Sequence, residues 1–143
     1  MSTNNLRHPL VSMLLFVAVL VAVRCSKDDT AIGPDGSPSD VIFPLDSVSY
    51  SLHVQRLFNQ TCALSGCHSA GESGDRLKLD SYENLRFGVR GLPVIIPGNA
   101  AQSELVLRIQ GSVGNRMPLS RNPLNQNQIN GIRAWINEGA RRN

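Results

Sequence analysis

The stretch Cys62-Ala63-Leu64-Ser65-Gly66-Cys67-His68 decides how this chain of 143 residues is interpreted. Two cysteines are separated by four residues, and a histidine directly follows the second cysteine. Two such thiols can bond the vinyl groups of a porphyrin, and the adjacent imidazole can then bind the iron. The pattern therefore predicts one covalent haem c, attached through Cys62 and Cys67, with His68 as the proximal iron ligand. The usual motif has two intervening residues, so the wider spacing makes the signal less specific.

The second axial ligand is expected from the loop Asn115-Arg116-Met117-Pro118. If residues 1–24 are removed as an export signal, Met117 is the only methionine left. A thioether is a soft ligand that favours reduced iron, and Pro118 stiffens the approach of the loop. We therefore predict that Met117 binds the iron on the distal side.

Hydrophobic periodicity predicts a domain made of short helices with long loops between them. In the first helix, Val48, Leu52, Gln55 and Phe58 fall on one line, with Leu57 beside them. In the last helix, a buried stripe follows Asn125, which forms a capping box with Gln128. The four predicted helices span 47–61, 80–87, 103–109 and 125–138. These helices offer few apolar residues, and an apolar cofactor in their midst would supply the missing core.

The order of these features resembles the small class I cytochrome c domains of exported bacterial proteins that carry a widened haem motif. The segments that carry the resemblance are Cys62–His68, Leu79–Tyr82, Val94–Gly98, Ser103–Leu105, Met117–Pro118 and Ile132–Ala140. The resemblance implies an all-α fold around one haem, with the first and last helices crossing beside it. It also implies thioethers at Cys62 and Cys67, with His68 proximal and Met117 distal. Many class I cytochromes have a Gly-Pro pair after the motif, whose proline carbonyl accepts from the proximal imidazole; here Ser69-Ala70-Gly71 follows, so the acceptor stays unassigned, with Pro93 and Pro97 as candidates.

The N-terminal residues predict export. Residues 1–24 contain an apolar run from Leu10 to Val23, which has the length of a signal-peptide core. Cys25 follows and resembles the lipidated cysteine of bacterial lipoproteins, although Arg24 stands where a small residue is usual. We expect a tether over 25–44, a haem domain over 45–143, and a periplasmic or outer-envelope location with a lipid anchor in a Gram-negative-type bacterium.

The charge of the chain excludes one class of partner. The net charge is +3, and without residues 1–24 it falls to about +1, which gives no basic surface for nucleic acid. We expect a monomer that exchanges single electrons with donor and acceptor proteins, rather than an enzyme.

Several alternatives remain open from the sequence. Cys62 and Cys67 could form a disulfide in a haem-free interaction module, or bind zinc with His68. His53 could replace Met117 as the distal ligand. An open distal position beside Arg116 would make the protein a haem enzyme or a ligand sensor.

Overall fold

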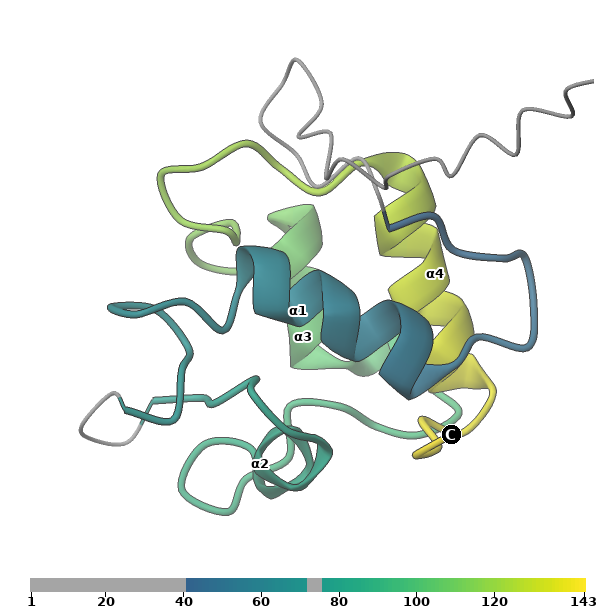
Figure 1. Cartoon of the computed structure of the whole chain (residues 1–143), viewed down its shortest axis with the longest axis horizontal. Helices are drawn as coiled ribbons and strands as arrows, with labels where there is room; N and C mark the ends of the chain where they lie inside the picture. The colour runs from purple at the N-terminus through teal and green to yellow at the C-terminus, as the bar shows by residue number, and fades with distance from the viewer. Residues whose placement is uncertain (1–40, 72–75) are drawn as a thin grey trace, which may run out of the picture.

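The computed structural model describes residues 41–71 and 76–143, which form a mostly helical domain (Figure 1). Within these residues the only β-type pairing is an isolated bridge between Val89 and Leu92, so the predicted all-α fold is confirmed. None of the helices in this part of the chain is long and apolar enough to cross a membrane. The elements are a π-helical turn η1 (Tyr50–Val54), α1 (Gln55–Thr61), α2 (Tyr82–Phe87), a 3-10 turn η2 (Ala100–Gln102), α3 (Glu104–Gln110) and α4 (Gln126–Asn137).

Local sequence signals define the helix ends, and the predicted capping box is among them. The side chain of Ser81 accepts a hydrogen bond from the Asn84 N–H at the start of α2. Asn125 and Gln128 form a reciprocal capping box at the start of α4. Gly111, with φ of +76°, ends α3 in the left-handed conformation that glycine adopts without strain. These ends set the lengths of the loops that line the candidate site.

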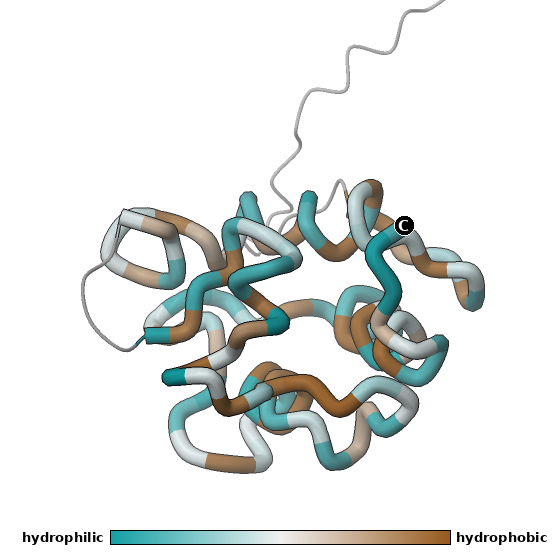
Figure 2. Tube along the Cα trace, turned by 90° about the horizontal axis from the view of Figure 1, so that it is seen from below, coloured by the Kyte–Doolittle hydropathy of each residue, from teal (hydrophilic) through white to brown (hydrophobic). Residues whose placement is uncertain are grey.

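The core lies where the first helical segment meets α4. Tyr50 of η1 packs on Trp135 of α4, with 5.4 Å between the ring centroids. Phe58 and Leu57 of α1 are fully buried, as expected. Hydrophobic and hydrophilic residues alternate along the trace, as short amphipathic helices require (Figure 2). The expected position of Leu52 on the buried line is wrong. Its side chain is 68% exposed, because the buried stripe of η1–α1 follows Tyr50, Val54, Leu57, Phe58 and Thr61.

The packed domain begins before Leu45, the expected boundary. Val41 and Phe43 are buried in the core. The side-chain amide of Asn127 in α4 makes two hydrogen bonds with the backbone of Phe43. Its Oδ1 accepts from the Phe43 N–H at 2.8 Å, and its Nδ2 donates to the Phe43 carbonyl at 3.0 Å. The end of the expected tether is therefore part of the folded domain. The expected boundary at residues 24 and 25 lies outside the described residues.

Candidate functional site

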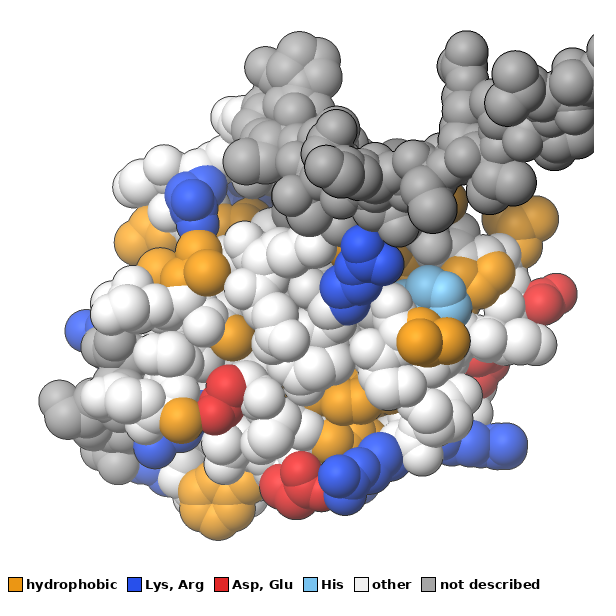
Figure 3. All heavy atoms as spheres, viewed as in Figure 1, with side chains coloured by type: hydrophobic (Ala, Val, Ile, Leu, Met, Phe, Trp, Pro, Cys, Tyr) orange, Lys and Arg blue, Asp and Glu red, His pale blue; other side chains and the backbone are white. Residues whose placement is uncertain are grey.

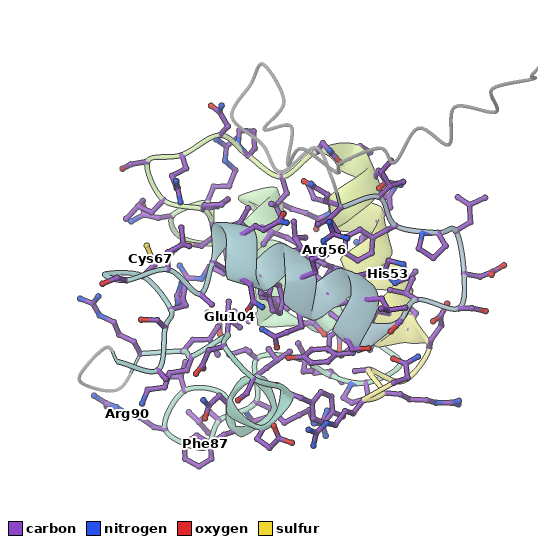
Figure 4. All side chains as sticks on the ribbon, in the orientation of Figure 1. His53, Arg56, Cys67, Phe87, Arg90 and Glu104 are labelled. Carbon is purple, nitrogen blue, oxygen red and sulfur yellow. The ribbon has the colours of Figure 1, made fainter. Side chains whose placement is uncertain are left out.

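The widened cysteine motif forms a closed turn at the end of α1. Cys62 directly follows Thr61, the last residue of α1, and its N–H donates to the Phe58 carbonyl at 2.8 Å. Gly66 has φ of +79°, which lets the chain reverse, and the His68 N–H then donates to the Cys62 carbonyl at 3.1 Å. The four intervening residues therefore bring His68 back beside Cys62, and Cys67 lies on the loop beyond α1 (Figure 4).

The two thiols of the motif have different surroundings. Both are free, but Cys62 is buried and Cys67 is exposed. Burial raises the pKa of Cys62 to about 11, while the hydroxyl of Thr61, 3.3 Å from the sulfur, and the charge of Arg121 act in the other direction. The buried thiol therefore stays protonated at neutral pH. Two free thiols give the disulfide alternative no support.

The imidazole of His68 is oriented by a backbone carbonyl. Nδ1 of His68 lies 2.8 Å from the Leu77 carbonyl oxygen and donates to it in the tautomer that this contact requires. The Leu79 N–H donates in turn to the His68 carbonyl at 2.9 Å. The acceptor that the sequence left unassigned is therefore Leu77, and neither candidate proline supplies it, since Pro93 and Pro97 lie exposed on another loop. With Nδ1 occupied, Nε2 is the ring nitrogen that remains for a metal.

Met117 lies on the loop between α3 and α4, and its N–H donates to the carbonyl of Arg108 at 2.9 Å. Its side chain is partly buried against the core, and Pro118 beside it is buried. Met117 lines the same cavity as Cys62, Cys67 and His68, and this cavity has a volume of about 550 Å³. The cavity therefore brings together all four residues that the sequence predicted as haem contacts.

The donors and walls of this cavity fit a haem. Its volume lies within the roughly 300–1,000 Å³ typical of cofactor sites. Aliphatic side chains supply the apolar walls, namely those of Leu77, Leu79, Val89, Val94, Leu105 and Ile109. Two thiols, an imidazole and a thioether are the ligand types of c-type haem. Arg76, Arg108 and Arg121 outnumber Glu104 among the charged lining residues, which suits the two carboxylates of the porphyrin.

The competing ligands do not reach this cavity. His53 lies at the other end of the first helical segment from Cys67 (Figure 4), where Nδ1 accepts from the Ser49 N–H at 3.1 Å. Arg116 packs its aliphatic part close to Gly111 and does not line the cavity. Over residues 41–71 and 76–143, no group of three His, Cys, Asp or Glu side chains is placed to hold a metal ion, which leaves zinc without support.

Two features of the site were missed by sequence reasoning. The Leu77 carbonyl has no signature, because any residue at that position presents the same oxygen. Arg108 was not singled out from the sequence, although the spacing Glu104–Arg108 is a recognised signal for an ion pair. Basic and acidic side chains are scattered over the face seen in Figure 3, without one basic patch. The predicted lipidation site, Cys25, lies outside the described residues.

Comparison with known proteins agrees with this geometry. A family model described as Planctomycete cytochrome C (PSCyt1) matches residues 65–118. The matched segment begins three residues after Cys62 and contains Cys67, His68 and Met117. A search of curated proteins gives no match for this chain. The helical fold and this match agree in that residues 65–118 are similar to a cytochrome c family model, and such a likeness implies haem-based electron transfer in general.

Proposed function

We propose that this protein is a monohaem c-type cytochrome that carries single electrons between redox proteins of the cell envelope. The observation that carries the proposal is the convergence of Cys62, Cys67, His68 and Met117 on one cavity. Haem iron, when bound, supplies one-electron chemistry by cycling between Fe(III) and Fe(II). Cys62 and Cys67 would hold the porphyrin covalently, and the apolar walls would keep water away from it.

The axial ligands decide between an electron carrier and an enzyme. His68 would bind through Nε2, since Nδ1 is directed to the Leu77 carbonyl. Met117 would fill the sixth position and leave no open site for peroxide or a diatomic gas. The exclusion of Arg116 from the cavity also argues against peroxidase chemistry at this site. An electron carrier is therefore favoured over a haem enzyme or a sensor.

Covalent attachment is tested by haem staining after denaturing electrophoresis. Protein made with the cytochrome c maturation machinery should retain the stain, and Cys62→Ser combined with Cys67→Ser should abolish it. Cys25→Ser is the matched control, because it removes the third thiol without touching the motif, and it should keep the stain. Retention of stain in the double variant would refute the attachment sites.

Axial ligation is tested by the weak far-red absorption band of a sulfur–Fe(III) bond. Met117→Ala should erase the band, lower the reduction potential and allow fast binding of carbon monoxide, because the thioether no longer favours Fe(II). Met117→His should stay six-coordinate but also have a lowered potential. Wild-type protein that binds carbon monoxide as fast as Met117→Ala would favour the enzyme or sensor.

We further propose that residues 1–24 direct export, that Cys25 carries a lipid anchor, and that the mature protein is a monomer facing redox partners in the envelope. The proposal is supported by the apolar run before Cys25 and the polar segment after it. Mass spectrometry of membrane-extracted protein should show a diacylglyceryl group on a chain that begins at Cys25. Soluble protein without lipid would leave export alone.

A further inference from the structure

The loop that carries Met117 is built around the side chain of Arg108. The loop leaves α3 at Gly111 and returns at Met117, whose N–H donates to the Arg108 carbonyl at 2.9 Å. Midway, Gly114 passes directly over the Arg108 guanidinium. A Cβ built on Gly114 would lie 3.0 Å from Cζ of Arg108 and would overlap Nη1. One residue of α3 therefore contacts the loop both at its middle and at its end.

The Arg108 side chain is itself held in place by Glu104, one turn earlier on α3. Nε and Nη2 of Arg108 each lie 3.1 Å from Oε1 of Glu104. Both side chains are partly exposed, so the ion pair contributes little to stability by itself. The ion pair instead orients the Arg108 guanidinium beneath Gly114.

The conformation of Gly114 strengthens this argument. Its φ of +53° lies in the left-handed region, where a side chain is strained, and a Cβ there would have to push the Arg108 guanidinium away from its place beside Glu104. Gly98 provides a comparison, since it also has positive φ, at +79°, but no atom lies within 4 Å of a Cβ built there. Glycine is therefore favoured at position 98 by its positive φ alone, whereas at position 114 it is favoured both by positive φ and by the nearby Arg108 guanidinium.

We propose that Arg108 is a positioning residue that sets the place of Met117 at the iron, acting through Glu104 and Gly114. The inference rests on the proposed role of Met117 as the distal ligand. Arg108 also lines the cavity, so a direct effect on the porphyrin carboxylates has to be separated from an effect on the loop. Gly114 does not line the cavity, and its substitution acts on the loop and on the guanidinium beneath it.

The test measures the far-red sulfur–iron band and the rate of carbon monoxide binding in the haem-loaded protein. Gly114→Ala should weaken the band and raise the binding rate by about tenfold, equivalent to a change of ~1.4 kcal/mol in the barrier. Gly98→Ala, which carries similar backbone strain without the contact, should match the wild type in both measurements. Glu104→Gln should move both measurements in the same direction as Gly114→Ala and is the variant to use if Gly114→Ala does not fold; because Glu104 lines the cavity, its effect on the loop is read from the exchange rate of the Met117 amide, which should also increase.

A double-mutant cycle separates positioning from general damage to the loop. Arg108→Ala should weaken the band, and Arg108→Lys should restore it only in part, because lysine lacks the planar fork. Gly114→Ala added to Arg108→Ala should cause no more change than Gly98→Ala, since the guanidinium is gone. Fully additive effects would show that the two residues act independently and would overturn the proposal.

The failures of the two proposals are distinguishable. A wild-type protein without the far-red band would refute Met117 as a ligand, and the positioning role would fall with it. A wild-type band that Met117→Ala erases, but that Gly114→Ala and Glu104→Gln leave unchanged, would refute only the role of Arg108. The exchange rate of the Met117 amide gives a second measure of the loop, and it should increase in Gly114→Ala.

Discussion

Replacing Gly131 by alanine will destabilise the domain, although alanine is the better helix former. Gly131 lies in the middle of α4 and is buried beneath Phe43. A Cβ at this position would overlap Cβ, Cγ and Cδ1 of Phe43. The overlapping atoms of Phe43 lie next to its backbone and cannot move aside by a side-chain rotation, so the segment around Phe43 has to move away from α4.

The size of the effect follows from what this segment loses. Phe43 is 3% exposed, and exposing such a side chain costs about 1.5–3 kcal/mol. The two hydrogen bonds between the Phe43 backbone and Asn127 contribute a further ~0.5–1.5 kcal/mol each. The gain in helix propensity from glycine to alanine is only about 1 kcal/mol. We therefore expect the free energy of unfolding to fall by about 1.5–5 kcal/mol.

The assay is urea unfolding of the haem-loaded protein, followed by circular dichroism. Phe43→Gly provides the matched background, because it removes every side-chain atom that meets the new Cβ. On that background Gly131→Ala should become stabilising, by about 1 kcal/mol. If Gly131→Ala leaves the wild type unchanged or makes it more stable, then Phe43 does not pack on α4.

Four further predictions concern the thiols, the last helix and the excluded histidine. In haem-free protein that keeps this fold, alkylation should reach exposed Cys67 before buried Cys62, and equal rates would show that Cys62 has lost its buried place. Burial raises the pKa of the Cys62 thiol from 9.0 to about 11. The stability that the protonated thiol contributes is therefore complete below pH 9 and should be lost as the pH rises through 11. Urea unfolding of the haem-free protein at several pH values measures this loss, with Cys62→Ala as the reference. Asn125→Ala removes the cap of α4 and should cost about 1 kcal/mol in urea unfolding, whereas Asn130→Ala, at an exposed position of the same helix, should cost less. His53→Ala should leave the far-red band and the reduction potential unchanged, and a shift in either would return His53 to the list of candidate ligands.

The helices were predictable because their signals are local. The capping box of Asn125 and Gln128 acts within one turn of the chain, and the structure confirms it. The buried stripe of α4 also follows directly from the spacing of Ile132, Trp135 and Ile136. Leu52 was misplaced because the first turn is π-helical and because the stripe that packs on α4 starts at Tyr50.

Features that depend on contacts between distant segments were not predictable. The burial of Phe43 depends on a notch at Gly131, and the sequence alone does not show that the two residues meet. The four cavity residues were identified from their chemistry, and only folding shows that they line one cavity. Arg108 acts through a glycine six residues later, in a loop whose path no periodic pattern describes.

The hydrogen bond between His68 and the Leu77 carbonyl has a consequence for protein engineering. Because the acceptor belongs to the main chain, no ordinary side-chain exchange at position 77 deletes it. Mutational scanning at position 77 would therefore report on the Leu77 side chain, which lines the cavity, and would not reveal the carbonyl that holds the imidazole. An engineer who wishes to retune the donor strength of His68 has to change the number of residues between 68 and 77, which shifts the carbonyl itself. The length of this segment, rather than the identity of residue 77, thus controls the hydrogen bond to the His68 imidazole.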